Sequence, residues 1–152
     1  MKLYLLRHAR PKPEAEDSQK PLAPEGLAQI KKITKIIELF SPIVADSVYH
    51  SPKTRARQTA ELVAKKIKVK NGLVETDGLT PHDDPAVWAG RIKKHNEDIV
   101  LAGHLPHLGR LAALLLTGNS EREIINFHPA TMACLIRTGK TWSLEWVINP
   151  NI

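Results

Sequence analysis

The sequence lacks most features of disulfide-bonded, thiolate-metal and membrane proteins. Its 152 residues include a single cysteine, Cys134, which excludes an intrachain disulfide and a zinc site built from several thiolates. No activating residues surround this cysteine in the sequence, so we expect a small buried side chain on a late strand. No apolar run approaches the ~20 residues that span a bilayer, and no signal-peptide pattern follows Met1. These features predict a cytoplasmic protein that does not insert into a membrane.

Aromatic residues are scarce, at 5%, whereas basic residues exceed acidic ones and give a formal charge of +6. The charge has two interpretations. It is either a solvated basic surface, with the lysine pairs at 31–32 and 65–66 on exposed helix faces, or an attraction for an anionic partner. Few aromatics and no RNA-binding or helix-turn-helix signature argue against nucleic acid as that partner.

The length predicts a single domain over residues 1–152. Apolar segments at 2–6, 46–50, 73–75 and 99–102 are typical of buried strands. Helical patterns cover about 25–40, 53–66, 86–95 and 107–116, the second with Ser51 as N-cap and Pro52 at its first position. Segments 132–136 and 142–147 flank Gly139 and Lys140 as a hairpin. The alternation predicts an α/β fold: one three-layer domain, a mostly parallel sheet with helices on both faces, and a C-terminal antiparallel hairpin.

Three motifs follow three of the predicted strands. Residues 5–10 read Leu-Leu-Arg-His-Ala-Arg, residues 51–60 read Ser-Pro-Lys-Thr-Arg-Ala-Arg-Gln-Thr-Ala, and residues 101–106 read Leu-Ala-Gly-His-Leu-Pro. Open α/β sheets bind ligands at the carboxyl ends of their strands, so we expect the three motifs to meet in one site.

Together, and in this order, the motifs resemble the histidine phosphatase superfamily, also called phosphoglycerate mutase-like. Ala9 stands where most members have glycine. Within the superfamily, the short chain, residues 20–26 and the Leu-Thr-Pro at 79–81 are most similar to the small SixA-type phosphohistidine phosphatases. The resemblance covers essentially the whole chain.

The resemblance implies four site residues. His8 is the expected nucleophile, because a neutral imidazole attacks phosphorus well when its other ring nitrogen is held. Arg7 and Arg55 are expected to grip the phosphoryl oxygens with their guanidinium forks, which lysine does not replace. His104 is the expected second histidine, donating a hydrogen bond to the phosphate. Arg10 and Arg57 are expected in surface salt bridges instead.

The general acid is where the sequence departs from the common superfamily pattern, since residues 77–84 hold no glutamate. The candidate proton donors are acidic residues and one histidine on two loops: Asp83, Asp84, Glu14, Asp17, Glu16 and His82. A phosphoester needs its leaving alkoxide protonated, whereas the imidazole of phosphohistidine is readily protonated from water. A weak acid machinery therefore favours a phosphohistidine substrate.

The expected function is hydrolysis of protein phosphohistidine through a covalent phosphohistidine on the enzyme. The expected partner is a phosphorylated protein, such as a histidine-phosphotransfer domain. We expect no cofactor and no metal, although His104 and His107 have the spacing of a metal-binding pair. His50 and His82 are expected at the rim of the site, and His95 and His128 outside it. A broad-specificity phosphomonoesterase, a mutase and a non-catalytic phosphate-binding module stay open as alternatives.

Overall fold

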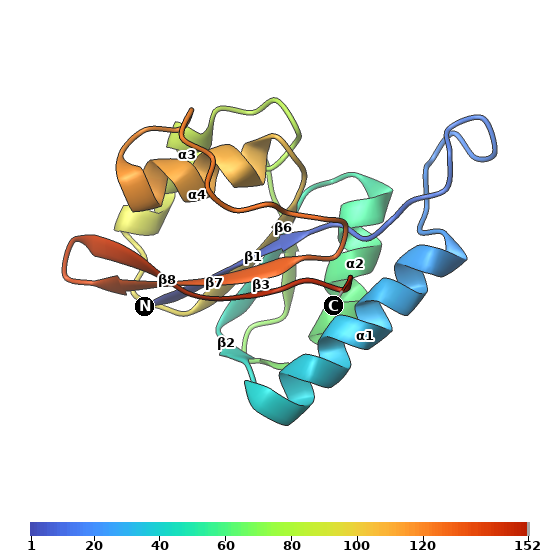
Figure 1. The fold of residues 1–152 in the computed structure, drawn as a ribbon, viewed down its shortest axis with the longest axis horizontal. Helices are drawn as coiled ribbons and strands as arrows, with labels where there is room; N and C mark the ends of the chain where they lie inside the picture. Colours follow the sequence, from blue (N-terminus) through green and yellow to red (C-terminus); the bar gives the residue numbers. More distant parts are fainter. Residues whose placement is uncertain (152) are drawn as a thin grey trace.

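The computed structural model describes residues 1–151, and their fold is a mostly parallel sheet covered by helices on both faces (Figure 1). The strands are β1 (Lys2–Arg7), β2 (Val44–Ala45), β3 (Ser47–His50), β4 (Lys68–Val69), β5 (Leu73–Glu75), β6 (Ile99–Gly103), β7 (Met132–Thr138) and β8 (Thr141–Ile148). The helices are α1 (Pro24–Phe40), α2 (Thr54–Ala64), α3 (Pro85–Lys93) and α4 (His107–Thr117).

The main sheet has the strand order β5-β3-β6-β1-β7-β8. The pairs from β5 to β1 are parallel, and the pairs from β1 to β8 are antiparallel. The carboxyl ends of β1, β3 and β6 therefore lie side by side at one edge. The predicted fold class, a mostly parallel sheet with a C-terminal antiparallel hairpin, is confirmed.

Alternating residues of the strands supply two separate cores. On one face, Tyr4 and Leu6 of β1 pack with Ile30 and Ile33 of α1 and with α2. On the other face, Leu3 and Leu5 pack with α3 and α4. The two-residue period of the strand sends neighbours to opposite faces, so β1 is apolar throughout and buried on both sides. Cys134 of β7 is buried in the first core, as expected, and burial raises its thiol pKa to about 11.

One local prediction is wrong and bears on the site. Ser51 is not the N-cap of α2, and Pro52 is not its first residue, because the helix begins at Thr54 with Lys53 as cap. Lys53 makes no side-chain capping bond. The Ser51 hydroxyl is instead directed to His104, as described below. The short parallel pair of β2 and β4 was not predicted, since two-residue strands leave no periodic signal.

Candidate active site

The sheet register places the ends of the three motifs next to one another. Arg7 of β1 is paired with Gly103 of β6, so His8 and His104 each come directly after a paired residue. On the far side of β6, His50 is paired with Ala102, and Ser51 follows it. Backbone bonds continue this alignment past the strands: His8 N donates to Gly103 O at 3.0 Å, and Ser51 N donates to Ala102 O at 3.1 Å. His8, His104 and Ser51 therefore share one edge of the sheet.

His8 is buried and oriented through one ring nitrogen. Its Nδ1 lies 2.8 Å from the backbone oxygen of Ala9. A carbonyl oxygen only accepts, so Nδ1 carries the proton and donates it, which leaves the lone pair on Nε2. The peptide of Ala9 is fixed in turn, since its N–H donates to Thr59 Oγ1 at 3.0 Å. The imidazole thus presents an unprotonated nitrogen in a fixed direction.

The second histidine lies against the first. The ring centroids of His8 and His104 are 5.0 Å apart, and the rings are inclined by 53°. His104 Nε2 is 2.8 Å from Ser51 Oγ. The other ring nitrogen of His104, Nδ1, is buried and has no hydrogen-bond partner among residues 1–151.

The two arginines reach the histidines from different elements. Arg7 ends β1, and its Nη1 donates to the backbone oxygen of Phe127 at 2.6 Å, while its buried Nε has no partner within residues 1–151. Arg55 lies in the first turn of α2 and is half-buried. Thr59 links this helix to the nucleophile, because its hydroxyl donates to Arg55 O at 2.7 Å and accepts from Ala9 N. One hydroxyl therefore ties the turn bearing Arg55 to the peptide after His8.

Both histidines are held neutral. Burial lowers the pKa of His8 to about 4, and the charges of Arg55, Arg7 and Lys20 add to the shift, against the bond to Ala9. Burial and the neighbouring His8 and Arg55 bring the pKa of His104 well below its ordinary value. Burial also lowers the pKa of Arg7 and Arg55, although a guanidinium keeps its charge in proteins. The site is thus two neutral imidazoles facing two fixed cations, an arrangement suited to a dianion.

The loop after His8 lines one side of a pocket whose other side is the amino end of α2. Pro11 and Leu22 form a bridge at its base, and it projects from the body of the molecule (Figure 1). The loop approaches α1 closely at Gly26, where a Cβ would clash with the backbone oxygen of Arg10. Between the loop and α2 lies an open, polar pocket. Its lining combines loop residues and residues at the start of the helix: Glu14, Ser18, Gln19, Lys20, Pro52, Lys53, Thr54 and Arg55.

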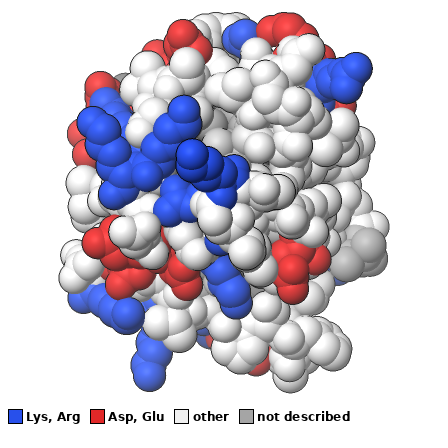
Figure 2. Space-filling model, turned by 90° about the vertical axis from the view of Figure 1, so that its left-hand side faces the viewer, with Lys and Arg blue, Asp and Glu red and all other residues white. Residues whose placement is uncertain are grey.

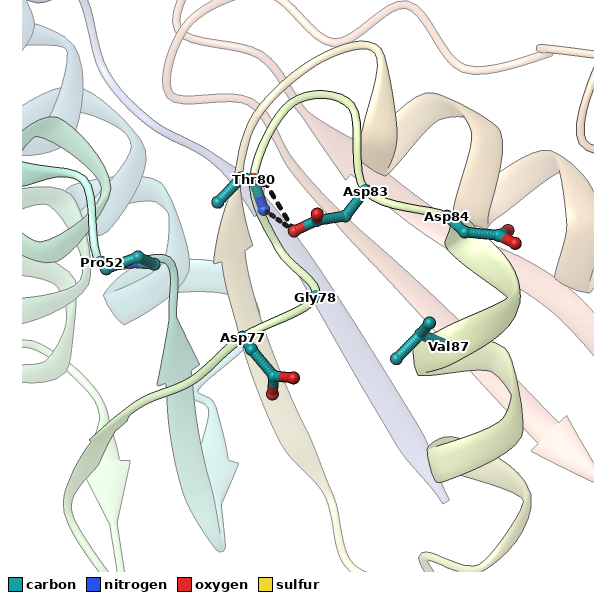
Figure 3. A pocket seen from close by; sticks show the side chains of 7 residues that line it. All are labelled: Pro52, Asp77, Gly78, Thr80, Asp83, Asp84 and Val87. Carbon is teal, nitrogen blue, oxygen red and sulfur yellow. Dashed lines mark hydrogen bonds between the residues drawn. The ribbon is translucent and has the colours of Figure 1, made fainter.

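The four principal acid candidates lie in different surroundings. Figure 3 shows Asp83 bonded to Thr80, whose N and Oγ1 donate to Oδ2 of Asp83 at 2.8 and 2.7 Å. These bonds lower the pKa of Asp83, which disfavours its protonated form. Asp84 caps α3 by accepting from Ala86 N at 2.9 Å.

On the loop after His8, Asp17 accepts from Gln19 N at 3.0 Å. Glu14 is the candidate that lines the polar pocket together with Arg55, and its neighbour Glu16 is exposed. His82 is exposed on the loop before α3. The pocket of Figure 3 shares Pro52 with the polar pocket, so the two hollows adjoin.

The remaining histidines differ from expectation in one case. His50 is buried rather than at the rim, with Nδ1 2.9 Å from Ser51 O. His95 pairs with Glu97 away from the site. His107 is fully buried, and neither ring nitrogen finds a partner within residues 1–151. Over the same residues, no group of three or more histidine, cysteine or acidic side chains lies close enough to hold a metal ion.

Charged side chains outside the site form surface ion pairs and gather on one face of the molecule. Arg10 pairs with Glu25 at 3.3 Å and Arg57 with Glu61 at 3.8 Å, as predicted. Figure 2 shows Lys and Arg side chains gathered on the side of the N-terminus and the β7–β8 turn, opposite the loop after His8. Part of the excess positive charge therefore faces away from the site. Within the described part of the chain, no helix is long and apolar enough to cross a membrane.

Sequence reasoning missed three groups that position the site. Thr59 fixes the Ala9 peptide, Gln58 Oε1 accepts from Leu22 N at 2.8 Å, and the backbone oxygen of Phe127 holds Arg7. Gln58 and Thr59 belong to the second motif, which continues past Arg55 to residue 60. This continuation was a signal that residues after Arg55 also contribute to the site. Phe127 lies in an irregular segment, where a backbone contact leaves no trace in the sequence.

Comparisons with solved structures agree with this fold. The fold resembles that of a solved protein histidine phosphatase SixA in complex with tungstate, with a TM-score of 0.85 and 22% identity, covering 99% of this chain and 98% of that one. An alpha-ribazole phosphatase from Shigella flexneri also matches, with a TM-score of 0.75 and 16% identity over 98% of this chain and 96% of that one. These structures define an α/β fold that several phosphatases share.

The family follows from the sequence itself. A family model described as histidine phosphatase superfamily (branch 1) matches residues 3–81, which hold the first two motifs. An uncharacterized protein of Picosynechococcus sp. is 28% identical over 131 residues, covering 82% of this chain and 78% of the relative. This chain belongs to the histidine phosphatase superfamily, branch 1.

Proposed function

We propose that this protein is a phosphohistidine phosphatase that acts on phosphorylated proteins. The observation that carries the proposal is the state of His8: a buried, neutral imidazole, held at Nδ1 by Ala9 O and set beside His104, Arg7 and Arg55. A module that only binds phosphate needs the cations but has no use for an oriented, unprotonated nitrogen. The arrangement therefore supports catalysis over the non-catalytic alternative.

The reaction has two balanced steps. Nε2 of His8 attacks phosphorus in line, a new N–P bond forms, and the N–P bond of the substrate breaks. The leaving imidazole keeps the electron pair of that bond and takes a proton from water. Water then attacks the phosphorus on His8, the N–P bond breaks, and phosphate departs. The attacking water releases a proton that balances the one taken by the leaving imidazole, and His8 returns to its starting state. Arg7, Arg55 and His104 stabilise the equatorial oxygens in both steps, which is the main requirement of phosphoryl transfer.

Two further observations support phosphohistidine as the substrate. Asp83 and Asp84 are engaged by Thr80 and by the start of α3, and the bonds from Thr80 favour the ionised form of Asp83. Neither residue is placed as a ready proton donor, and expulsion of imidazole needs none. The open pocket beside Arg55 also suits a phosphate displayed on another protein, such as a histidine-phosphotransfer domain. The SixA likeness agrees with this substrate class.

One observation favours a second candidate, a small-molecule phosphomonoesterase. Glu14 lines the same pocket as Arg55, where a carboxylic acid would protonate a leaving alkoxide. Other proteins of this fold include the alpha-ribazole phosphatase described above. If this candidate is right, Glu14→Gln removes phosphoester turnover and leaves phosphohistidine turnover unchanged.

The test is a direct comparison of substrates. Phosphate release is measured from a phosphorylated histidine-phosphotransfer domain and from a panel of sugar phosphates, phosphoserine and an aryl phosphate. We expect the phosphoprotein to give the highest kcat/KM and His8→Ala to abolish turnover. Rapid quenching with labelled substrate should trap an acid-labile, alkali-stable phosphoenzyme in the wild type alone. A preference for sugar phosphates would overturn the substrate, and full activity of His8→Ala would overturn the chemistry.

A further inference from the structure

Ser51 and His104 form a buried side-chain pair at the edge of the sheet. Ser51 is fully buried and His104 is 1% exposed. Ser51 Oγ lies 2.8 Å from His104 Nε2, and the N–H of Lys53 donates to the same oxygen at 3.3 Å. Within residues 1–151, the Ser51 hydroxyl has no other hydrogen-bond partner, and His104 Nδ1 has none at all.

Counting protons gives the direction of the bond between the two side chains. A hydroxyl has one proton to donate, and its oxygen accepts from others. Ser51 Oγ already accepts from Lys53 N–H. If it donates its own proton to His104 Nε2, both the oxygen and its proton are satisfied. In the opposite arrangement, with the proton on Nε2, the buried serine proton has no acceptor within residues 1–151, and an unpaired buried donor is unfavourable.

The direction decides what His104 offers to a phosphate. Burial and the neighbouring cations keep His104 neutral, so its ring carries one proton and has one donor. If Nε2 accepts from Ser51, the proton is on Nδ1, which has no hydrogen-bond partner within residues 1–151. Because Ser51 occupies Nε2, Nδ1 is the ring nitrogen left to donate to a phosphoryl group bound at His8. The other tautomer would turn a lone pair toward the anion, which repels it.

We propose that Ser51 is a positioning residue, which donates its hydroxyl proton to His104 Nε2 and thereby fixes His104 in the tautomer that donates from Nδ1 to the phosphoryl group. The role assigned to His104 rests on the proposed function, whereas the tautomer itself is a property of the free protein. Within residues 1–151 the Ser51 hydroxyl makes no hydrogen bond to His8, and we assign its effect to His104 alone. Ser51, the first residue of the second motif, therefore positions His104 of the third motif and is not the N-cap of α2.

The first measurement is the tautomer in the unliganded protein. Long-range proton–nitrogen correlation spectra of the nitrogen-labelled wild type show which ring nitrogen of each neutral histidine bears the proton. A His104→Gln variant identifies the His104 signals. We expect the proton on Nδ1 in the wild type and its transfer to Nε2, wholly or in part, in Ser51→Ala. A proton on Nε2 in the wild type, or an unchanged pattern in Ser51→Ala, overturns the proposal.

The second measurement tests the consequence for an anion in the pocket. Vanadate binding is titrated calorimetrically in the wild type, Ser51→Ala and Ser51→Thr, with Ser47→Ala as control. Ser47 is a buried serine at the other end of the same strand. Loss of a hydrogen bond to a charged group should weaken binding on the order of tenfold to a hundredfold in Ser51→Ala. Ser51→Thr should retain binding and the wild-type tautomer, and equal binding by Ser51→Ala and the wild type overturns the proposal.

Failure of this proposal and failure of the proposed function give different results. If the tautomer and vanadate results are as expected but no phosphohistidine is hydrolysed, the proposed function is wrong and the role of Ser51 stands. If phosphohistidine is hydrolysed but the proton is on Nε2, the role of Ser51 alone is wrong.

Discussion

The depressed pKa of His8 makes a quantitative prediction about the pH dependence of the reaction. The nucleophile must be neutral to attack, and burial with the nearby cations lowers its pKa to about 4. At about pH 5, a histidine with the ordinary pKa of ~6.5 would be only ~3% neutral, whereas His8 would be roughly 90% neutral. We therefore expect the contribution of His8 to kcat/KM to stay nearly constant from about pH 8 to about pH 5. An ordinary histidine would lose about thirtyfold over that range.

The assay is phosphate release from the phosphoprotein across this pH range, with spontaneous hydrolysis measured without enzyme and subtracted. Circular dichroism at each pH is the control for unfolding. That control matters because the folded-state pKa of His8, His104 and His107 lies below the unfolded value. The unfolded chain then binds more protons, so the stabilisation is complete above about pH 6.5 and is lost as the pH falls toward about 4.

The reasoning would be refuted by a rate that falls in a single titration near pH 6.5 while circular dichroism shows the protein folded. Such a result would mean that His8 is exposed to solvent in the working enzyme, or that another group carries the attack. A nitrogen-detected titration of His8 separates these two explanations, because only the first predicts a pKa near 6.5 for His8 itself.

Three substitutions test other parts of the structure. Arg55→Lys should lower kcat/KM by roughly 30-fold to 1000-fold, since losing one preorganised donor costs about 2–4 kcal/mol, whereas Arg57→Lys in the exposed pair with Glu61 should change it little. A loss below about threefold would place Arg55 outside the site. Gly26→Ala should destabilise the fold by about 1–3 kcal/mol in urea unfolding, because its Cβ would meet Arg10 O, whereas Gly90→Ala, with open space around it, should stabilise by about 0.5–1 kcal/mol. His107→Leu should raise the free energy of unfolding near neutral pH, because burial keeps His107 neutral and neither ring nitrogen has a partner within residues 1–151. From about pH 7.5 to about pH 5, the free energy of unfolding should fall by about 2 kcal/mol less in this variant than in the wild type, because the variant lacks the lowered pKa of His107. Lower stability of this variant at neutral pH would show that the imidazole has a partner.

The sequence by itself determined the fold class and the meeting of the motifs. Strand 2–6 is largely apolar without alternation, as expected of a strand buried on both faces, and helical patterns separate the later apolar runs up to the C-terminal hairpin. Parallel strands end at the same edge, so motifs that follow strands had to converge. His8 and His104 each follow a parallel strand, so this rule alone predicts that they lie close together. The exposure of Arg10 and Arg57 and the burial of Cys134 likewise followed from residue type and position.

The tertiary structure alone decided how the site is held. Ser51 followed by Pro52 has the form of a helix start, yet the helix begins at Thr54, and the Ser51 hydroxyl accepts from Lys53 N–H and also contacts His104 Nε2. Other features of the site depend on contacts between segments far apart in the sequence. Arg7 Nη1 donates to Phe127 O, and Ala9 N donates to Thr59 Oγ1. His50 is buried in the same way. A local sequence pattern indicates the secondary structure of one segment but not the hydrogen bonds that the segment makes with distant residues. A buried polar group has lost its contact with water and must pair with a group inside the protein. The packing of the whole chain therefore decides which partner it finds.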